Sequence, residues 1–538
     1  MTVEDATVPS PARPAACQLA GQRLRLASAV LSVSLLAVSA WNIFVNNGTH
    51  QDVSWLLTAG EKFLAGRTLY VDVLETNPPF SIYLYLPMVW LDAMTPLPAE
   101  IWTKIATVVW VLFFGAAALR MARRLRLISA SEAAILAPAG IYVLFLFSPY
   151  TFSQREHFAV ASALPMLVLA AWRMIAGDPR QLRLGWVLVA GFGAAATMMV
   201  KPHYALVFLL PYLLAAWSAR SLRVPFGAEI VASAALVIAY GSAMWLLHPL
   251  YVTEMVPLLL DVYGYRRALG VLLVLDWEQL VLGALLAGLL VVAAPRRNNP
   301  LPWAFGAAAI GFFCAFLVLG KGWPYHSMPG LSLTLIAIAL AGARWAFAEI
   351  DKKGEVPIGA IFIALLVAAG VAVSQTALYW SIPKPPAALV ARLNAVAASP
   401  AVASVSHDIG TGHPLTRSLN GRWIERMCSD WLVMGGEHAL LDPDLPAADR
   451  KRIEARIDET IARKVADWTA TPPDFVFLDV DPIGSIEALR EHPDLAPLLE
   501  NYRVVARDGR VDIALRSDLL PDWEAAATRA SSPGAASD

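Results

Sequence analysis

Long apolar runs separated by short polar segments occupy residues 26–380 of the chain. Runs long enough to cross a bilayer as a helix, roughly 17 to 25 residues, lie near 26–45, 99–119, 129–148, 157–174, 184–200, 203–218, 226–247, 270–293, 302–319, 327–347 and 356–377. This pattern predicts a polytopic α-helical membrane protein with about eleven transmembrane helices. Pro87 and Asp92 interrupt a shorter run at 78–94, which we expect to form an interfacial helix in the first loop.

Basic residues concentrate in one set of alternating loops and so predict the orientation. They are Arg23, Arg25, Arg120, Arg123, Arg124, Arg126, Arg173, Arg180, Arg183, Arg220, Arg223, Arg296, Arg297, Arg344, Lys352 and Lys353. The positive-inside rule assigns these loops, and the N-terminal segment 1–25, to the cytoplasm. The first apolar run lacks a small-residue cleavage pattern, so we interpret it as a retained anchor. The Ala-, Arg- and Leu-rich composition favours a multi-pass protein of a bacterial inner (plasma) membrane.

The chain after the last apolar run has the composition of a soluble domain. A Pro-rich joint at 382–386 leads into residues 381–525, for which we expect a small periplasmic α/β domain. The patterns predict strands at 403–409 and 474–480, a helix at 447–468, and a hairpin at 502–516. Two alternating runs joined by Asp508-Gly509 favour a primed turn there. The tail 526–538 is predicted to be disordered.

Composition and charge exclude some classes of function. Hydrophobic residues make up 57% of the chain, and the formal net charge of −1 gives no reason to expect a nucleic-acid partner. The bilayer itself is the expected environment. The three cysteines fall in three different regions, so we expect neither a disulfide framework nor a cysteine-based metal site.

The loop after the first span, residues 46–98, is unusually polar for its position. It carries Asp52, Glu61, Asp72 and Glu75, followed by Asn77-Pro78-Pro79. Carboxylates and a Pro-Pro break occur at membrane depth only where they line a wet cavity or lie at the interface. We therefore expect this loop to form the floor of an extracytoplasmic active site, with Asp72 and Glu75 among the substrate contacts.

An acid just after the first span, the segment Gly66-Arg67…Tyr70-Val71-Asp72, the Asn77-Pro78-Pro79 break and an aromatic interfacial helix together resemble the GT-C superfamily of membrane glycosyltransferases. Lipid A aminoarabinose transferases and protein mannosyltransferases belong to it. The resemblance implies a GT-C transmembrane domain over 26–380. It also implies transfer of a sugar from a polyprenyl-phosphate carrier to a glycan, lipid or protein acceptor outside the cytoplasm, with inversion.

The same resemblance places Asp52 in the active site. Inverting transfer needs a carboxylate to accept the proton of the attacking hydroxyl, and Asp52 has that chemistry. The structural alternative is that Asp52 caps a helix over 53–65, because Asp is a favoured N-cap residue.

The second outer loop contains Gln154-Arg155-Glu156-His157 at the start of a span. Superfamily members often carry a second acid there, usually Asp, so Glu156 is a candidate catalytic residue, with Arg155 and His157 as substrate contacts. A divalent metal, Mg²⁺ or Mn²⁺, on Asp52, Glu156 and His157 stays open, because carboxylate and imidazole suit such ions although no tight ligand spacing is present. Alternatively, Glu156 interacts favourably with a helix amino terminus.

A departing polyprenyl phosphate requires fixed positive charge, which lowers the barrier as charge develops. Candidates in the outer loops are Lys201 with His203, Arg266 with Arg267, and Lys321 with His326. Each could instead extend its charged end toward the interface. Tyr325 is a candidate for stacking on a sugar, although such aromatic residues more often form the membrane-surface belt.

Other functions remain open at this stage. One alternative is an O-antigen-ligase-like enzyme, which would move a whole glycan. Another is a lipid-linked glycan transporter or flippase, which would have charged residues deep within its spans and would be built from internal repeats. In the outer domain, His407, Asp408, His413, Asp430 and His438 lack a hydrolase or zinc spacing, and we expect them to be solvated loop residues. Arg422 and Arg426 are candidates to contact the acceptor or close the cavity.

Overall fold

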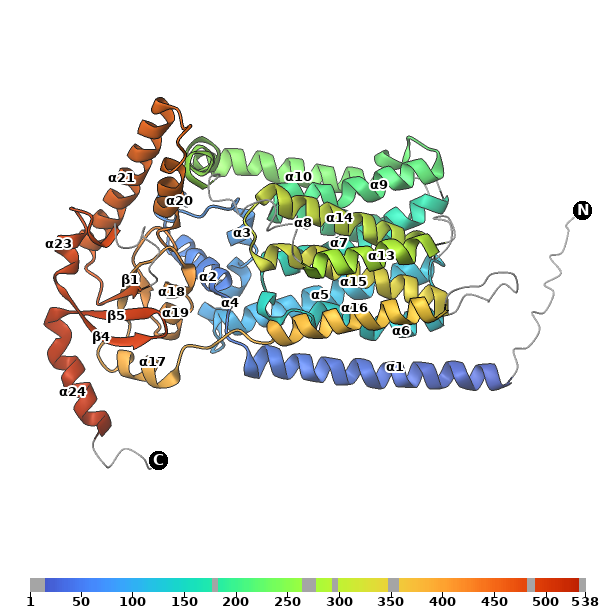
Figure 1. The fold of residues 1–538 in the computed structure, drawn as a ribbon, viewed down its shortest axis with the longest axis horizontal. Helices are drawn as coiled ribbons and strands as arrows, with labels where there is room; N and C mark the ends of the chain where they lie inside the picture. Colours follow the sequence, from blue (N-terminus) through green and yellow to red (C-terminus); the bar gives the residue numbers. More distant parts are fainter. Residues whose placement is uncertain are drawn as a thin grey trace, which may run out of the picture.

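The computed structural model describes residues 15–176, 182–263, 277–292, 299–346, 358–480 and 489–531. A long helical bundle carries a smaller α/β unit at one end (Figure 1). We call this end of the bundle the capped end and the opposite end the uncapped end. Arg266 and Arg267 lie outside the described residues.

Each predicted span coincides with a helix in the described part of the chain. The bundle consists of α1 (Ala15–Trp41), α5 (Ala99–Arg124), α6 (Ala130–Ile141), α7 (Arg155–Ala176), α8 (Leu184–Val200), α9 (Leu206–Ala219), α10 (Ala228–Leu247), α13 (Trp277–Val292), α14 (Pro300–Leu319), α15 (Pro324–Ala346) and α16 (Ile358–Leu378). Within the described residues, 7 segments are long and apolar enough to cross a membrane, and the other bundle helices are shorter apolar segments. The polytopic membrane fold is therefore confirmed.

The loop between α1 and α5 contains three short helices, two of which lie in the segment 78–94 that was predicted to be helical. They are α2 (Gln51–Leu64), α3 (Phe80–Tyr83) and α4 (Leu86–Met94). The helix expected at 78–94 is present from Phe80 to Met94, with a short break between α3 and α4. Pro87, in the first turn of α4, has no amide hydrogen and starts a new helix more readily than it continues one. Tyr85 at the break is fully buried and donates to the Ser153 carbonyl at 2.7 Å.

The α/β unit contains one mixed five-stranded sheet in the order β2-β1-β3-β5-β4. Its strands are β1 (Ala401–Val405), β2 (Arg422–Trp423), β3 (Phe475–Asp479), β4 (Tyr502–Asp508) and β5 (Val511–Arg516). β1 runs parallel to β2 and β3, whereas β5 is antiparallel to β3 and β4. The β4–β5 hairpin turns one residue later than expected. Asp508 pairs with Val511, so the loop consists of Gly509, with φ of 56°, and Arg510.

Seven helices surround this sheet in the described residues. They are α17 (Ala387–Asn394), α18 (Ile409–Gly412), α19 (Leu415–Ser418), α20 (Trp431–Leu440), α21 (Ala447–Ala470), α23 (Ala496–Leu499) and α24 (Leu520–Ser531). Disorder was predicted from residue 526 onward, but α24 continues to Ser531. This helix is amphipathic, and Trp523 on its apolar side is buried. Residues 532–538 lie outside the described part.

The two faces of the sheet belong to different apolar cores, as expected from the alternation of side chains along a strand. One face, with Val405 and Val476, packs against Trp468 of α21. The other face, with Phe475 and Phe477, joins an apolar cluster that also contains Trp55, Leu57 and Tyr85 from the loop between α1 and α5. The α/β unit is thus fixed to the bundle by a core that both parts share.

The joint between the last span and the α/β unit is also fixed. Asn47 accepts a hydrogen bond from the Ile382 amide at 2.6 Å, and the Gly48 amide donates to the Ile382 carbonyl at 2.9 Å. A Cβ at Gly48 would lie 2.6 Å from the Pro383 carbonyl oxygen, so this close approach requires glycine. The Pro-rich segment is therefore held against the end of α1.

A buried ion pair lies toward the uncapped end. Arg173 in α7 donates to both carboxylate oxygens of Glu229 in α10, through Nε at 3.0 Å and Nη2 at 2.9 Å. Tyr212 of α9 adds a hydrogen bond to the same carboxylate at 3.1 Å. Both charged side chains have 0% exposure. This two-bond geometry, typical of a strong arginine–carboxylate pair, joins three helices.

Candidate active site

A cavity of about 540 Å³ lies at the capped end, where the bundle, the loop between α1 and α5, and the α/β unit meet. Its volume is within the roughly 300–1,000 Å³ range of small-molecule sites. Its charged and imidazole-bearing lining residues are His50, Asp52, Glu75, Arg155, Lys201, His203, His326, His407, Asp408 and Arg510. The cavity thus brings Asp52, Glu75, Arg155, Lys201, His203, Tyr325 and His326 of the candidate residues into one lining.

Asp52 lies in the first turn of α2 and lines the cavity. The N-cap of α2 is His50, whose Nδ1 accepts the Asp52 amide at 3.1 Å, so the structural alternative, in which Asp52 is the cap, is wrong. Burial lowers the pKa of His50, which keeps its ring neutral and able to accept this bond. The Asp52 carboxylate is therefore not needed as the cap and faces the cavity, 3.8 Å from Nη2 of Arg155.

Glu75 lines the same cavity, but its oxygens already hold the loop together. One oxygen accepts the Trp55 indole N–H at 2.5 Å, and the other accepts the Asn77 backbone amide at 2.9 Å. These bonds tie α2 to the Asn-Pro-Pro turn. Asp72 does not line the cavity and instead accepts the Thr68 amide at 2.9 Å within its own turn. The arrangement gives both acids a structural role.

Glu156 lies behind the cavity wall, whereas its partner Lys201 is part of the wall. Glu156 has 1% exposure, and its Oε1 is 2.5 Å from Nζ of Lys201. Nζ also lies 2.9 Å from Nε2 of His326, which lines the cavity too. A buried lysine is thus held between a carboxylate and an imidazole and presented to the cavity.

The residues considered as metal ligands are not brought together as one ligand set. Asp52 lies beside Arg155, Glu156 lies beside Lys201, and the His157 ring is hydrogen-bonded to the Leu144 carbonyl at 2.7 Å, outside the cavity lining. Among the described residues, no group of three or more His, Cys, Asp or Glu side chains has the geometry to hold a metal ion.

The remaining candidates divide between the cavity and other places. His203 and Tyr325 line the cavity, and the Tyr325 ring lies edge-on to His50 with centroids 5.8 Å apart. Lys321 is buried between two glycines with positive φ and does not line the cavity. These positions leave Lys201 and Arg155 as the cations that line the cavity from the bundle.

The α/β unit forms the opposite wall, but through other residues than Arg422 and Arg426, which the sequence suggested. His407 and Asp408 directly follow β1, Trp431 begins α20, and Arg510 lies in the hairpin loop. Arg510 pairs with Asp408 and lies 3.3 Å from Asp479 at the end of β3. Because β1 and β3 are parallel, their carboxyl ends meet at one edge, which is where ligands bind in many α/β sheets. That rule was the signal that could have identified this wall.

The expectation that the histidine and aspartate residues of this domain are solvated is wrong for two of them. His413 has 0% exposure and lies between the rings of Trp55 and Trp423, and burial lowers its pKa to about 3. Asp430 pairs with the buried Lys464 at 2.9 Å. Both residues support the shared core and the domain interior.

The arginines proposed to close the cavity lie elsewhere. Arg422 is exposed in β2, and Arg426 pairs with Asp467 at 3.0 Å. The Arg426 carbonyl accepts the Leu74 amide at 2.8 Å. Neither side chain lines the cavity, so this segment attaches the α/β unit to the loop between α1 and α5.

The charge distribution suits displacement chemistry at an anionic leaving group. A carboxylate, that of Asp52, shares the cavity with Lys201 and Arg155, each of which is only 6% exposed. Charges in such a water-poor site interact more strongly than in bulk water. A carboxylate there can accept a proton, while the two cations stabilise negative charge that develops on a phosphate.

No family model matches the chain. No curated protein matches it either. Solved structures do match its fold. The crystal structure of ArnT from Cupriavidus metallidurans bound to undecaprenyl phosphate aligns with a TM-score of 0.50 at 15% identity, over 90% of this chain and 97% of that chain. The apo oligosaccharyltransferase of Archaeoglobus fulgidus aligns with a TM-score of 0.47 at 12% identity, over 90% of this chain and 72% of that one. The likeness to ArnT confirms the GT-C resemblance as a resemblance of fold.

Proposed function

We propose that the chain is an inverting glycosyltransferase of a bacterial inner membrane, with the capped end and the α/β unit in the periplasm and the amino terminus in the cytoplasm. The donor is a sugar linked to a polyprenyl phosphate, and the acceptor is a glycan, lipid or protein hydroxyl. ArnT, whose fold the chain shares, was crystallised with undecaprenyl phosphate, and this lipid is the carrier that we propose for the present chain.

One observation carries this proposal. Asp52, Arg155 and Lys201 line a single cavity, so that a carboxylate in the first turn of α2 shares one space with two cations from the bundle. A proton-coupled transporter would place its carboxylates along a path through the bundle, whereas the charged residues of this cavity lie at one end of it.

In the proposed reaction, the acceptor oxygen attacks the anomeric carbon from the face opposite the carrier phosphate. The new carbon–oxygen bond forms as the bond to the phosphate oxygen breaks, and that oxygen keeps the electron pair. Asp52 accepts the proton of the acceptor hydroxyl. Lys201 and Arg155 stabilise the charge that develops on the departing polyprenyl phosphate. The reacting sugar carries oxocarbenium character during the transfer.

Glu156 acts in this proposal through Lys201 and is a positioning residue. The 2.5 Å ion pair holds the ammonium group in the wall and offsets part of the cost of burying it. The charge for phosphate departure comes from Lys201 and Arg155. Transfer rates with EDTA, then with added Mg²⁺ or Mn²⁺, would report whether a divalent ion contributes.

The opposite wall suits a hydroxyl-rich acceptor. Asp408 and Arg510 provide hydrogen-bonding groups, and Trp431 provides an aromatic face of the kind that packs on sugar rings. Two walls from different parts of the chain would thus hold donor and acceptor on opposite sides of Asp52.

The test is lipid analysis of a deletion strain complemented with wild type, Asp52→Asn or the control Asp72→Asn. We expect a polyprenyl-phosphate sugar to accumulate in the deletion strain while an envelope glycan or lipid loses the same sugar. Wild type and Asp72→Asn should restore both, and Asp52→Asn should restore neither. Redistribution of a lipid-linked species between leaflets without loss of the sugar would contradict the proposal and favour a transporter.

A further inference from the structure

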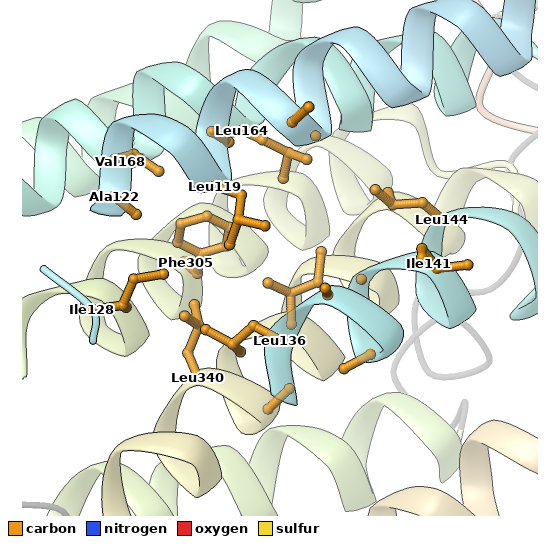
Figure 2. Close-up of a pocket in the computed structure, with 18 of the residues that line it drawn as sticks. Leu119, Ala122, Ile128, Leu136, Ile141, Leu144, Leu164, Val168, Phe305 and Leu340 are labelled. Atoms are coloured by element: carbon orange, nitrogen blue, oxygen red, sulfur yellow. The ribbon is translucent and has the colours of Figure 1, made fainter. Parts of the chain in front are cut away.

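A second cavity lies within the bundle toward the uncapped end and is apolar throughout. It has a volume of about 250 Å³, and α5, α6, α7, α14 and α15 supply its walls. Figure 2 shows its labelled side chains, among them Leu119, Leu136, Phe305 and Leu340, and the sticks drawn there are carbon only. An apolar cavity of about 150 Å³ already stays dry and binds small apolar molecules. This larger cavity, in a membrane-spanning region, is suited to hydrocarbon.

An arginine lies at the rim of this cavity. Arg123 is one helical turn beyond Leu119 on α5, and its Nη1 donates to the Ile128 carbonyl at 3.2 Å. Leu119 and Ile128 both line the cavity. Residues four apart share one face of a helix, so the apolar lining of α5 continues directly into Arg123.

Other positive charges surround the same rim. Arg120, Arg124 and Arg126 are exposed near the end of α5, and within the described residues no ion pair joins these three or Arg123 to a carboxylate. Glu132 on α6, one turn before the lining residue Leu136, lies 3.3 Å from Arg344 of α15. Arg344 in turn follows the lining residue Leu340 by one turn. Among the described residues, the local charge at the rim is therefore positive.

We propose that this cavity and its arginines form a binding site for an anionic phospholipid, with an acyl chain in the cavity and the phosphate head group at Arg120 and Arg123. Hydrocarbon chains are the surrounding medium of this part of the bundle, and basic pockets between helices at a membrane surface suit acidic head groups. The site is independent of the glycosyl-transfer cavity, since the two cavities share no lining residue.

The donor's polyprenyl tail fits this site less well than a phospholipid does. Its phosphate belongs to the capped end in the proposed function, so only uncharged hydrocarbon would reach the second cavity, and the arginines would have no partner. The positive-inside rule accounts for arginines in this loop. It does not account for an apolar cavity whose lining leads directly into them.

The experiment is a lipid titration of the purified full-length protein, followed by native mass spectrometry. Phosphatidylglycerol and phosphatidylcholine with the same acyl chains are compared, so that only the head group differs. We expect phosphatidylglycerol to bind more tightly. Arg120→Gln/Arg123→Gln should lower its affinity by about fivefold per arginine and lower that of phosphatidylcholine less, because the choline group offsets the charge of its phosphate.

A second variant tests the cavity itself. Gly140 lines it, and a Cβ there would meet no atom within 4 Å, so Gly140→Leu should fill the space without disturbing the fold. We expect this variant to lower the affinity for both lipids to a similar extent. The matched controls are Arg223→Gln, an exposed arginine in another loop of the same side, and Gly241→Leu, a helix glycine that also faces open space but does not line the cavity.

Three results would overturn the site. They are equal affinity for the two lipids, unchanged phosphatidylglycerol binding in the double arginine variant, and competition in which a polyprenyl phosphate displaces phosphatidylglycerol at one-to-one stoichiometry. The last result would assign the cavity to the carrier tail. None of these readouts depends on transferase activity, so failure here and failure of the proposed function are distinguishable.

Discussion

Two buried sets of charges, at opposite ends of the bundle, differ in what surrounds them. Toward the uncapped end, Arg173 and Glu229 satisfy each other through two hydrogen bonds and have 0% exposure. At the capped end, Lys201 pairs with Glu156 and also faces a cavity, while the Arg155–Asp52 separation of 3.8 Å is longer than a hydrogen bond. The first set is closed and the second is open.

This difference indicates which buried charges can do chemistry. A closed pair has both partners occupied, so its contribution is to fix the helices that carry it. An open set keeps charged atoms directed at a space that a substrate can enter. Burial alone does not separate the two classes, since the residues in both are nearly inaccessible to solvent. The cavity beside the second set does.

The largest expected effect comes from breaking the closed pair. Arg173→Ala leaves Glu229 buried without its partner, and we expect a loss of about 3–5 kcal/mol in the free energy of unfolding. Thermal unfolding of the purified protein measures it. The double variant Arg173→Gln/Glu229→Gln should recover much of the loss and keep wild-type transfer per folded molecule. If the double variant lost transfer at unchanged stability, the closed pair would have a role in the reaction and not only in the fold.

Replacing the open pair should have the reverse outcome. Lys201→Gln/Glu156→Gln removes both charges, so no uncompensated ion remains, and we expect the unfolding temperature to change little. Transfer should fall by about 10²–10³-fold, the usual loss for one electrostatic contact to a developing charge. Steady-state assays with saturating acceptor measure the effect. Retained activity would show that the ammonium group does not assist phosphate departure.

The joint offers an intermediate test at the capped end. Gly48→Ala places a methyl group 2.6 Å from the Pro383 carbonyl oxygen, and we expect about 1–3 kcal/mol of destabilisation from this overpacking. Proteolysis should increase in the segment after α16, because the clash acts there. The control is Gly21→Ala on α1, where an added Cβ meets no atom within 4 Å. Equal protease resistance in both variants would contradict a fixed joint.

The smallest effect concerns an acid that belongs to neither set. Glu437 on α20 has no ion-pair partner among the described residues, and burial raises its pKa to about 7. The folded state then binds a proton between about pH 4.5 and pH 7 that the unfolded state releases, so stability falls as the pH rises through this window. Glu437→Gln should remove that decline, worth about 1 kcal/mol after solvent screening. Denaturant titrations at pH 5 and pH 8 measure it.

The spans could be predicted because lipid leaves a long apolar run few alternatives to a helix. Asp52 could also be singled out from the sequence, since a carboxylate just after a span has a restricted set of roles. Its neighbour His50 was not, because histidine is an uncommon N-cap and only the fold brings its Nδ1 to the Asp52 amide. Glu75 could be identified as unusual, but not as the residue that ties Trp55 to the Asn-Pro-Pro turn.

The second wall of the cavity could not be predicted from local patterns. Asp408 and Arg510 are far apart in the sequence and meet only through strand order, in which β3 lies between β1 and β5. A hairpin turn shifted by one residue was enough to hide Arg510, because the shift moves it from a strand into the loop. Long-range pairing therefore decided the half of the site that the sequence did not indicate.

The core shared by the two parts of the capped end has a consequence for biosynthesis. The rings of Trp55 and Trp423 both contact the His413 ring, yet most of the chain is synthesised between these two tryptophans. At synthesis rates of about 5–20 residues per second, the loop carrying Trp55 waits on the order of tens of seconds for its partner. In the proposed orientation it waits in the periplasm with its apolar side uncovered. The proposed active site is consequently completed last.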